Sequence, residues 1–223
     1  MDDFSAKRQA LLNIGVKMMD PSTVYVEESV EVGAGTLLLP GTILRGKTII
    51  GSNCEIGPNT MLVDCTVGDN VTINSSQCNE SIIDSGAHVG PFAYIRPNCH
   101  VGAGVKGGDF VELKNSTIGA ETKISHLTYV GDADVGRQVN FGCGTVLVNY
   151  DGNRKYRSTI GDHCFIGCNT NLVSPVHIGD GAYTAAGSTI TQDVEPDALA
   201  IARARQVDKP GWAAAHRSKK DSV

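Results

Sequence analysis

The residues best suited to chemistry include two cations that follow aliphatic residues at a fixed spacing. Arg96 follows Ile95 and Lys114 follows Leu113, so that the second cation stands eighteen positions after the first. If the chain repeats its path at this interval, the two side chains stack on one face, where like charges repel each other. An anion held between them would relieve that repulsion. The spacing therefore predicts a binding site for an anionic group.

A histidine, two cysteines and an alanine form a second series. His126, Cys143, Cys168 and Ala186 each lie two positions after the equivalent residue of a six-residue unit, and their successive spacings are seventeen, twenty-five and eighteen positions. One short step accounts for the first spacing, and an insertion accounts for the second, so that each spacing corresponds to one full turn of the chain. We expect the four residues to form a line along one edge of the molecule, along which a long, thin ligand could lie.

The insertion is a third candidate feature. Leu147 and Ile160 lie thirteen positions apart where the period would give six, so that seven residues must leave the repeat. They fall within residues 148–157, which are rich in turn formers, aromatic rings and cations. Loops on a rigid scaffold often carry binding groups, and we expect this loop to contribute to a site. A solvated insertion without function is the alternative.

A repeat of six residues must position all of these side chains. An aliphatic residue followed by a small one recurs at this spacing in Ile160-Gly161, Ile166-Gly167, Leu172-Val173 and Ile178-Gly179. This period suits a short strand and a tight turn, with the aliphatic side chain pointing inward. Such units bury little alone, so they must stack as coils of a parallel β-helix. With three units to a coil, residues 24–194 supply about nine coils.

The two ends of the chain depart from the repeat. Residues 4–19 are expected to form a helix that stops at Asp20-Pro21, because proline disfavours helix at the residue before it. The predicted organisation is a helix or linker remnant over residues 1–20, a β-helix domain over 21–195, and an irregular C-terminal extension over 196–223. The last, charged residues of that extension are expected to be mobile.

Composition and charge exclude several classes of protein. The 223 residues contain 19 Lys plus Arg and 24 Asp plus Glu, and this net charge of −5 speaks against a nucleic-acid-binding protein. No apolar run reaches the roughly 20 residues that cross a bilayer. The N-terminus also lacks the pattern of a signal peptide, so we expect a cytoplasmic protein without membrane contact.

The seven cysteines form an odd set without a C-x-x-C pair. This pattern favours free thiols, most of them small buried residues, over a disulfide framework. His163, Cys164 and Cys168 are the closest approach to a metal-ligand cluster, and we interpret them as core and turn positions. The sequence therefore predicts no metal site.

Three motifs carry a family resemblance: residues 126–132 (H-L-T-Y-V-G-D), 110–114 (F-V-E-L-K) and 149–152 (N-Y-D-G). They resemble the acetyltransferase half of the bacterial bifunctional enzymes that combine glucosamine-1-phosphate N-acetyltransferase and N-acetylglucosamine-1-phosphate uridyltransferase activities, and the likeness extends over about residues 20–212. The resemblance implies a left-handed β-helix and a homotrimer with active sites between neighbouring protomers. It also implies acetyl transfer from acetyl-CoA to the 2-amino group of glucosamine 1-phosphate, a step toward UDP-N-acetylglucosamine and the peptidoglycan of the cell wall.

The resemblance also implies roles for individual residues. The general base falls on His126, and Glu112 is a candidate to orient its ring. Contacts with the sugar phosphate fall on Arg96, Lys114, Tyr129, Asn140 and Lys155. Contacts with acetyl-CoA fall on Cys143, Asn149, Tyr150, Cys168, Ala186 and, in the C-terminal extension, Arg203. The backbone N–H of Cys143 is the expected donor to the oxyanion of the acetyl group, and the reaction requires no metal.

Several features depart from the family pattern. Cys143 and Cys168 stand where the family usually has Ala and Ser, and Asp109 replaces a more common Asn near the phosphate-binding cations. No L-x-x-G-x-G-T-R-M nucleotide loop occurs, so we expect no uridyltransferase activity, and a separate partner would have to supply that step. Two alternative functions stay open: a hexapeptide acetyltransferase for another amino sugar, and a non-catalytic trimeric scaffold or regulatory subunit.

Overall fold

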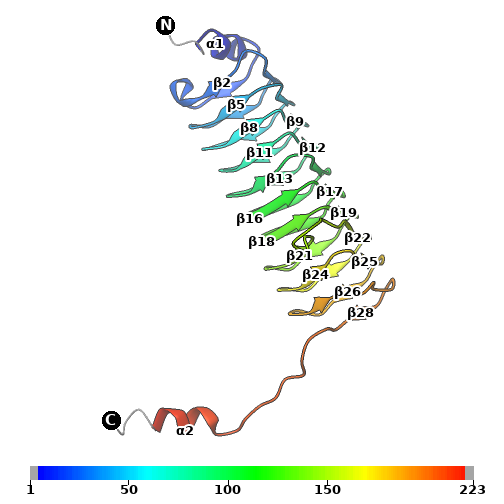
Figure 1. The fold of residues 1–223 in the computed structure, drawn as a ribbon. Coiled ribbons are helices and arrows are strands. Elements are labelled where there is room, and N and C mark those ends of the chain that lie inside the picture. The colour runs from blue at the N-terminus through cyan, green and yellow to red at the C-terminus, as the bar shows by residue number, and fades with distance from the viewer. Residues whose placement is uncertain (1–4, 219–223) are drawn as a thin grey trace.

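The body of the molecule is a left-handed parallel β-helix of about ten turns. The computed structural model describes residues 5–218, and Figure 1 shows the coils stacked in chain order from one end to the other. The prediction of stacked coils is confirmed, with about ten turns where the residue count gave about nine. Successive coils contribute strands to three walls, so that the helix has the form of a prism.

The first wall opens each coil. Its strands are β1 (Lys17–Met18), β4 (Leu37–Leu38), β7 (Glu55–Ile56), β10 (Thr72–Ile73), β13 (His88–Val89), β16 (Lys106–Lys114), β18 (Lys123–Gly131), β20 (Asn140–Phe141), β23 (Phe165–Ile166), β26 (Tyr183–Thr184) and β28 (Leu199–Ala200). The strands pair in parallel with their equivalents in the next coil, as β20 does with β23. Two of them, β16 and β18, are nine residues long and continue around the corner into the second wall.

The second and third walls follow in each coil. A 3-10 turn, η1 (Pro21–Thr23), leads into the second wall, whose strands are β2 (Tyr25–Val26), β5 (Ile43–Arg45), β8 (Met61–Val63), β11 (Gln77–Asn79), β14 (Tyr94–Ile95), β21 (Val146–Val148), β24 (Asn171–Val173) and β27 (Thr189–Ile190). The third wall is a nine-stranded sheet of β3 (Glu31–Val32), β6 (Ile49–Ile50), β9 (Thr66–Val67), β12 (Ile82–Ile83), β15 (His100–Val101), β17 (Thr117–Ile118), β19 (Ala133–Val135), β22 (Ser158–Ile160) and β25 (His177–Ile178).

The interior of the prism is filled by inward-facing side chains, mostly aliphatic, stacked coil upon coil. In the second wall these include Leu44, Leu62, Ile95 and Leu113, each at most 1% exposed. Full burial of such a side chain contributes about 1.5–3 kcal/mol, so that the stack is the main source of stability. Five of the seven cysteines are also buried, as expected.

The corner between the first and second walls has an unusual backbone. Phe92 and Phe110 take the left-handed conformation there, with φ of 59° and 56°, which is rare for aromatic residues. Both side chains are exposed, and their rings stack with centroids 5.5 Å apart. Strained residues of this kind gather at functional sites, and this corner also carries the residues described below.

The N-terminal helix is shorter than expected. Helix α1 (Ser5–Asn13) ends well before the predicted limit of residues 4–19, and Phe4 lies outside the described residues. The reason is Gly15, which takes φ of +94° while its N–H donates to the Leu12 carbonyl at 3.1 Å. A glycine in this conformation closes a helix, and the chain turns directly into β1.

The C-terminal segment leaves the prism after one last strand. Strand β28 pairs with β26, and the chain then runs away from the body as far as helix α2 (Trp212–Ser218) (Figure 1). The extension that was expected to be irregular therefore contains two short regular elements. No helix within residues 5–218 combines the length and apolar character needed to cross a bilayer. The expectation of a mobile end falls on residues 219–223, outside the described part.

Candidate functional site

The predicted line of four residues is confirmed by the register of the strands. Strand β18 pairs with β20, β20 with β23 and β23 with β26, and in each case the paired inward residues lie two positions before a member of the line. His126, Cys143, Cys168 and Ala186 therefore occupy the same corner position in four successive coils. All four are exposed, so that the line is open to a ligand.

The preceding coil holds the His126 ring through Asp109. The two residues are paired in the ladder of β16 and β18, and His126 Nδ1 lies 2.9 Å from Asp109 Oδ1. Glu112, which was expected to orient the ring, instead places its Oε1 2.8 Å from Arg96 Nη1. The correction has a simple physical reason. Asp109 lies directly beside His126, whereas Glu112 pairs with Tyr129 beyond the corner.

This hydrogen bond defines which nitrogen of the neutral ring can accept a proton. The bond from His126 lowers the pKa of Asp109, so that its carboxylate is ionised at neutral pH and only accepts hydrogen bonds. Nδ1 of His126 must then carry the proton, which leaves the lone pair on Nε2. The His126 side chain is 61% exposed. The ring is therefore accessible to a ligand from solvent.

The two predicted cations lie one coil apart, because β14 and β16 are in register. Each has a carboxylate within the chain. Arg96 pairs with Glu112 at 2.8 Å, and Lys114 Nζ lies 3.6 Å from Asp132 Oδ2. Repulsion between the cations is thus offset by neighbouring side chains, and the argument that an anion must relieve it does not hold.

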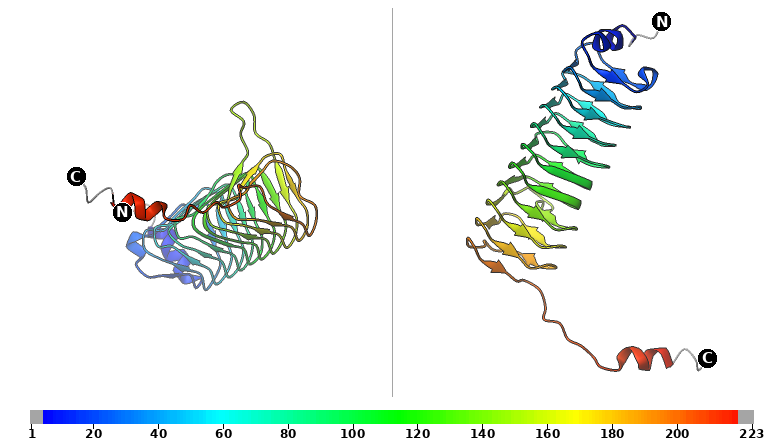
Figure 2. Two further views of the ribbon diagram at one scale, coloured as in Figure 1. Left: turned by 90° about the horizontal axis from the view of Figure 1, so that it is seen from below. Right: turned by 180° about the vertical axis from the view of Figure 1, so that it is seen from behind.

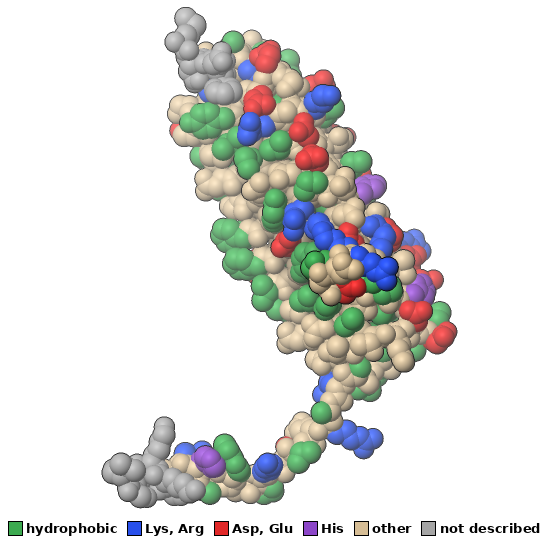
Figure 3. Space-filling view, viewed as in Figure 1, with side chains coloured by type: hydrophobic (Ala, Val, Ile, Leu, Met, Phe, Trp, Pro, Cys, Tyr) green, Lys and Arg blue, Asp and Glu red, His purple; other side chains and the backbone are tan. Residues whose placement is uncertain are grey.

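The inserted loop brings a third cation to this face. The contact with the Lys155 ammonium lowers the pKa of Lys114, and burial lowers it further. Tyr129 lies close to the cluster. Its hydroxyl packs against Gly131, since a Cβ added to Gly131 would lie 2.3 Å from the hydroxyl oxygen. Figure 3 shows basic side chains gathered near the middle of the prism. Two ammonium groups in contact favour a ligand with more than one negative charge, such as a phosphate.

Asp132 anchors this cluster from inside. It is 6% exposed, its Oδ1 accepts a hydrogen bond from Asn115 at 2.5 Å, and its Oδ2 accepts one from Asn149. Burial alone would raise the pKa of Asp132, but these hydrogen bonds and the charges of Lys114 and Lys155 hold it below its ordinary value. Asn149 was expected to contact acetyl-CoA. The residue is only 6% exposed and its side-chain amide donates to this network, while the expected contact with acetyl-CoA stays a prediction.

We expect Asp132→Asn to lower the free energy of unfolding at pH 7 by about 1–3 kcal/mol, because the buried hydrogen bonds to a charged acceptor and the ion pair are lost. A carboxylate with a depressed pKa stabilises the fold above its unfolded pKa, and this contribution disappears as pH falls through the folded pKa. Urea unfolding at pH 7 and at about pH 3 should therefore show a difference that shrinks in acid. Asp208→Asn, in the exposed extension, is the matched control, and a pH-independent difference for Asp132→Asn would contradict the assignment.

The inserted loop is ordered by its own residues. Tyr150 and Lys155 form an antiparallel bridge, and Asp151 Oδ1 accepts two backbone N–H groups at 2.8 Å. At the base of the loop, the Arg157 guanidinium pairs with Asp134 at 2.5 Å. Figure 2 shows this excursion projecting from the prism. A projecting, ordered loop is suited to contact a ligand.

Two predicted contacts lie apart from the cations. Asn140 is on the first wall, paired with Lys123 and Phe165, whereas the cations are on the second wall. Arg203 is exposed at the far end of the line. Its side chain lies near Gly187, since a Cβ added to Gly187 would lie 3.9 Å from Arg203 Cδ. A single protomer thus presents the line along its corner, with the cations on one side and Asn140 on the other.

Sequence reasoning assigned no role to three residues of the site: Asp109, Asp132 and Arg157. The spacing contained a signal for Asp109, because the same short step that relates His126 to Cys143 also relates Asp109 to His126. Asp132 is the last residue of the 126–132 motif and Arg157 is the last residue of the 148–157 segment, but the sequence does not predict the partners of either side chain.

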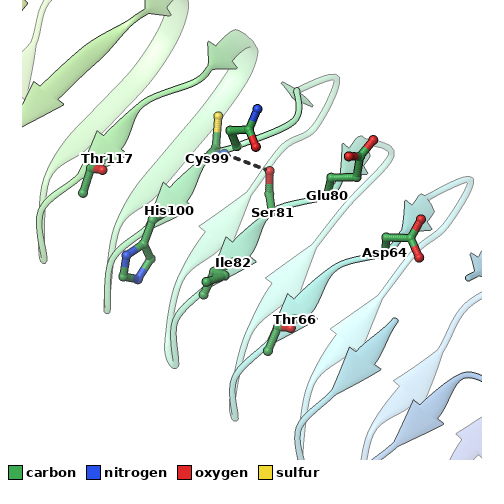
Figure 4. A pocket seen from close by; sticks show the side chains of 9 residues that line it. Asp64, Thr66, Glu80, Ser81, Ile82, Cys99, His100 and Thr117 are labelled. Carbon is green, nitrogen blue, oxygen red and sulfur yellow. Dashed lines mark hydrogen bonds between the residues drawn. The ribbon is translucent and has the colours of Figure 1, made fainter. Parts of the chain in front are cut away.

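A further hollow, of about 450 Å³, lies at the third wall. Figure 4 shows its side chains spread along successive coils, with Asp64 and Glu80 near one corner and His100 on the wall. Its lining contains no Lys or Arg, which makes it unsuited to an anionic ligand. Within the described part of the chain, no three His, Cys, Asp or Glu side chains are grouped to hold a metal ion.

Comparisons with known proteins agree with this architecture. The bacterial transferase hexapeptide (six repeats) family matches residues 29–63 and 157–192. The bifunctional protein GlmU of Clostridium kluyveri is 54% identical over 198 residues, which cover 89% of this chain and 43% of that protein. The GlmU of Acetivibrio thermocellus is 55% identical over the same shares. The chain therefore spans less than half the length of these relatives.

Two solved structures share the fold at low sequence identity. The Francisella novicida UDP-N-acetylglucosamine acyltransferase has a TM-score of 0.52 and 18% identity, over 81% of this chain and 66% of that one. The Arabidopsis UDP-N-acetylglucosamine acyltransferase has a TM-score of 0.51 and 14% identity, over 92% of this chain and 75% of that one. With the repeats, these findings show that the chain carries bacterial transferase hexapeptide repeats in the two matched segments and is similar to the C-terminal half of the bifunctional GlmU proteins.

Proposed function

We propose that this chain transfers the acetyl group of acetyl-CoA to the 2-amino group of glucosamine 1-phosphate. The observation that carries the proposal is the geometry of β18. This one strand presents His126, fixed by Asp109, at the corner, and continues to Tyr129 beside the cations Lys114 and Lys155. A sugar that carries an amine and a phosphate could reach both groups at once.

The chain's own residues would divide the work as follows. His126 Nε2 accepts the proton of the attacking amine, while Asp109 stabilises the imidazolium that forms. The backbone N–H of Cys143 makes no hydrogen bond within residues 5–218, so it is available to the carbonyl oxygen that gains charge. Arg96, Lys114 and Lys155 hold the phosphate. Acetyl-CoA, as co-substrate, supplies the thioester.

The line of exposed corner positions would receive that co-substrate. Cys168 and Ala186 have small side chains, which leave room for a narrow pantetheine arm along the coils. Arg203 lies beyond them at the C-terminal end, where a cation suits the phosphates of the nucleotide. Tyr150, on the projecting loop, is exposed and available to the same ligand.

We also propose that the active protein is a homotrimer. Asn140 and the cations lie on different walls of one prism, so that a single chain does not bring all predicted substrate contacts together. A neighbouring protomer that packs against the corner would complete the site. The projecting loop and the extended C-terminal segment are both placed to reach such a neighbour (Figure 2).

The test is release of free thiol from acetyl-CoA with three acceptors: glucosamine 1-phosphate, glucosamine 6-phosphate and glucosamine. We expect turnover with the 1-phosphate alone, because the cations and Nε2 then act on one molecule. Equal turnover with another amino sugar would replace the proposed acceptor. No turnover with any acceptor, from protein that is folded and trimeric, would contradict the enzyme function and favour a scaffold.

A further inference from the structure

The cysteines of this chain fall into two groups. Cys54, Cys65, Cys78, Cys99 and Cys164 are buried, and burial raises the pKa of each of these thiols. Cys143 and Cys168 are exposed. Because thiolate formation and access control reactivity, the buried group should be inert and the exposed pair available to reagents in solution.

The exposed pair lies in direct register on neighbouring coils. The Asn169 N–H donates to the Cys143 carbonyl at 2.8 Å, which is the ladder bond expected when Cys143 and Cys168 are partners. The two corners also approach closely, since a Cβ added at Gly142 would lie 2.4 Å from the Cys168 nitrogen. Partners in neighbouring strands are about 4.8 Å apart. That spacing falls within the Cα separation of about 4.4–6.8 Å that a disulfide spans.

Cys143 and Cys168 lie on the exposed line, so that a cross-link between them would affect a ligand bound there. Cys143 is one coil from His126, and Cys168 lies between Cys143 and Ala186 on the exposed line. A disulfide between the two corners would lie along the line and occupy the surface between Cys143 and Cys168. A ligand that runs along the line would then lose its path to His126.

We propose that Cys143 and Cys168 form a dithiol site that small-molecule disulfides oxidise to an intramolecular disulfide, and that this cross-link blocks the acyl-donor line. One cysteine thiolate attacks a sulfur of the oxidant, for example oxidised glutathione, and releases one glutathione thiol. The second cysteine attacks the mixed disulfide, forms the internal S–S bond and releases the second glutathione. In total, two protein thiols and one small disulfide give one protein disulfide and two small thiols.

The cross-link itself is independent of the proposed function, whereas its effect on acetyl transfer rests on it. The first measurement is therefore chemical. In the native, folded chain, a chromogenic thiol reagent should react rapidly with two thiols, and with the other five only after denaturation. After treatment with oxidised glutathione, mass spectrometry of an unreduced digest should find a peptide pair joined through residues 143 and 168.

Single substitutions give the matched controls. In Cys143→Ala or Cys168→Ser, the remaining thiol has no partner and should retain one glutathione as a mixed disulfide. Cys54→Ala removes a buried thiol and should leave the cross-link unchanged. Two stable glutathione adducts on the unsubstituted chain, or a bond between two chains on a non-reducing gel, would overturn the proposal.

The effect on acetyl transfer is then measured on the unsubstituted chain alone. Activity should fall in proportion to the cross-linked fraction and return with dithiothreitol, and bound acetyl-CoA should slow the oxidation. Full activity of the cross-linked chain would overturn the proposed block. If the reduced chain is inactive as well, the proposed function fails, while the cross-link is still decided by the mass spectrum.

Discussion

Replacing His126 with alanine is expected to lower kcat for acetyl transfer to glucosamine 1-phosphate about 10²–10⁴-fold, the usual contribution of a positioned general base. The loss should fall on kcat and leave the affinity for acetyl-CoA largely intact, since the ring acts on the acceptor amine. Steady-state kinetics combined with calorimetric titration of acetyl-CoA separates the two effects. The exposed ring has few packing contacts, so that the oligomer should persist in size-exclusion chromatography.

Asp109→Asn provides the matched comparison. The amide keeps the shape but can no longer act as a carboxylate acceptor for His126 Nδ1, so activity should fall less than in His126→Ala. The kcat of the double variant should equal that of His126→Ala alone, because Asp109 acts through the ring. Independent, additive losses would show that Asp109 has another role. Unchanged kcat in His126→Ala would remove the histidine from the mechanism altogether.

Replacing Lys155 with methionine should raise KM for glucosamine 1-phosphate by about 10–100-fold, because a hydrogen bond to a charged group contributes about 1.5–3 kcal/mol. Lys155 lies on the exposed loop, where its charge lowers the pKa of Asp132 but repels Lys114, so that the two effects oppose each other and the variant should unfold at nearly the same temperature. Because Lys155 lowers the pKa of Lys114, the removal of Lys155 should raise that pKa toward its ordinary value. The measurement is KM for the acceptor across a series of salt concentrations.

Lys47→Met is the control for the general loss of one positive charge. This lysine is exposed at the N-terminal end of the prism, far along the chain from the cation cluster, and should leave KM unchanged. A steep salt dependence in the parent protein that flattens in Lys155→Met would identify a direct ionic contact. Equal effects of the two substitutions would mean that only net charge matters.

The fold was predictable because a single local rule generates it. An inward aliphatic residue every six positions determines the strand, the turn and the stacking, and the same count aligns His126 with Cys143 in neighbouring coils. The rule failed at the N-terminal end, where residues 17 and 18 read as helix but form β1. There the decisive signal was one glycine, whose left-handed conformation ends the helix.

The partners of charged side chains were less predictable. Glu112 belongs to the predicted motif, but its position in the strand gives it Arg96, and the His126 ring goes to Asp109. Asp109 and Glu112 lie three positions apart in β16. The six-residue period does not predict which of the two lies before the corner, beside His126, and which lies after it.

The stacking of coils has a consequence for how such a protein can change over evolutionary time. Each coil contacts mainly its two neighbours, so that a substitution is felt mostly within one layer. The cations that we propose to bind the acceptor and the end of the line near Arg203 that we propose to bind the donor lie on layers that do not touch. Mutations in either set of layers can therefore accumulate separately, and under the proposed function a lineage could change its acceptor without changing its acyl donor.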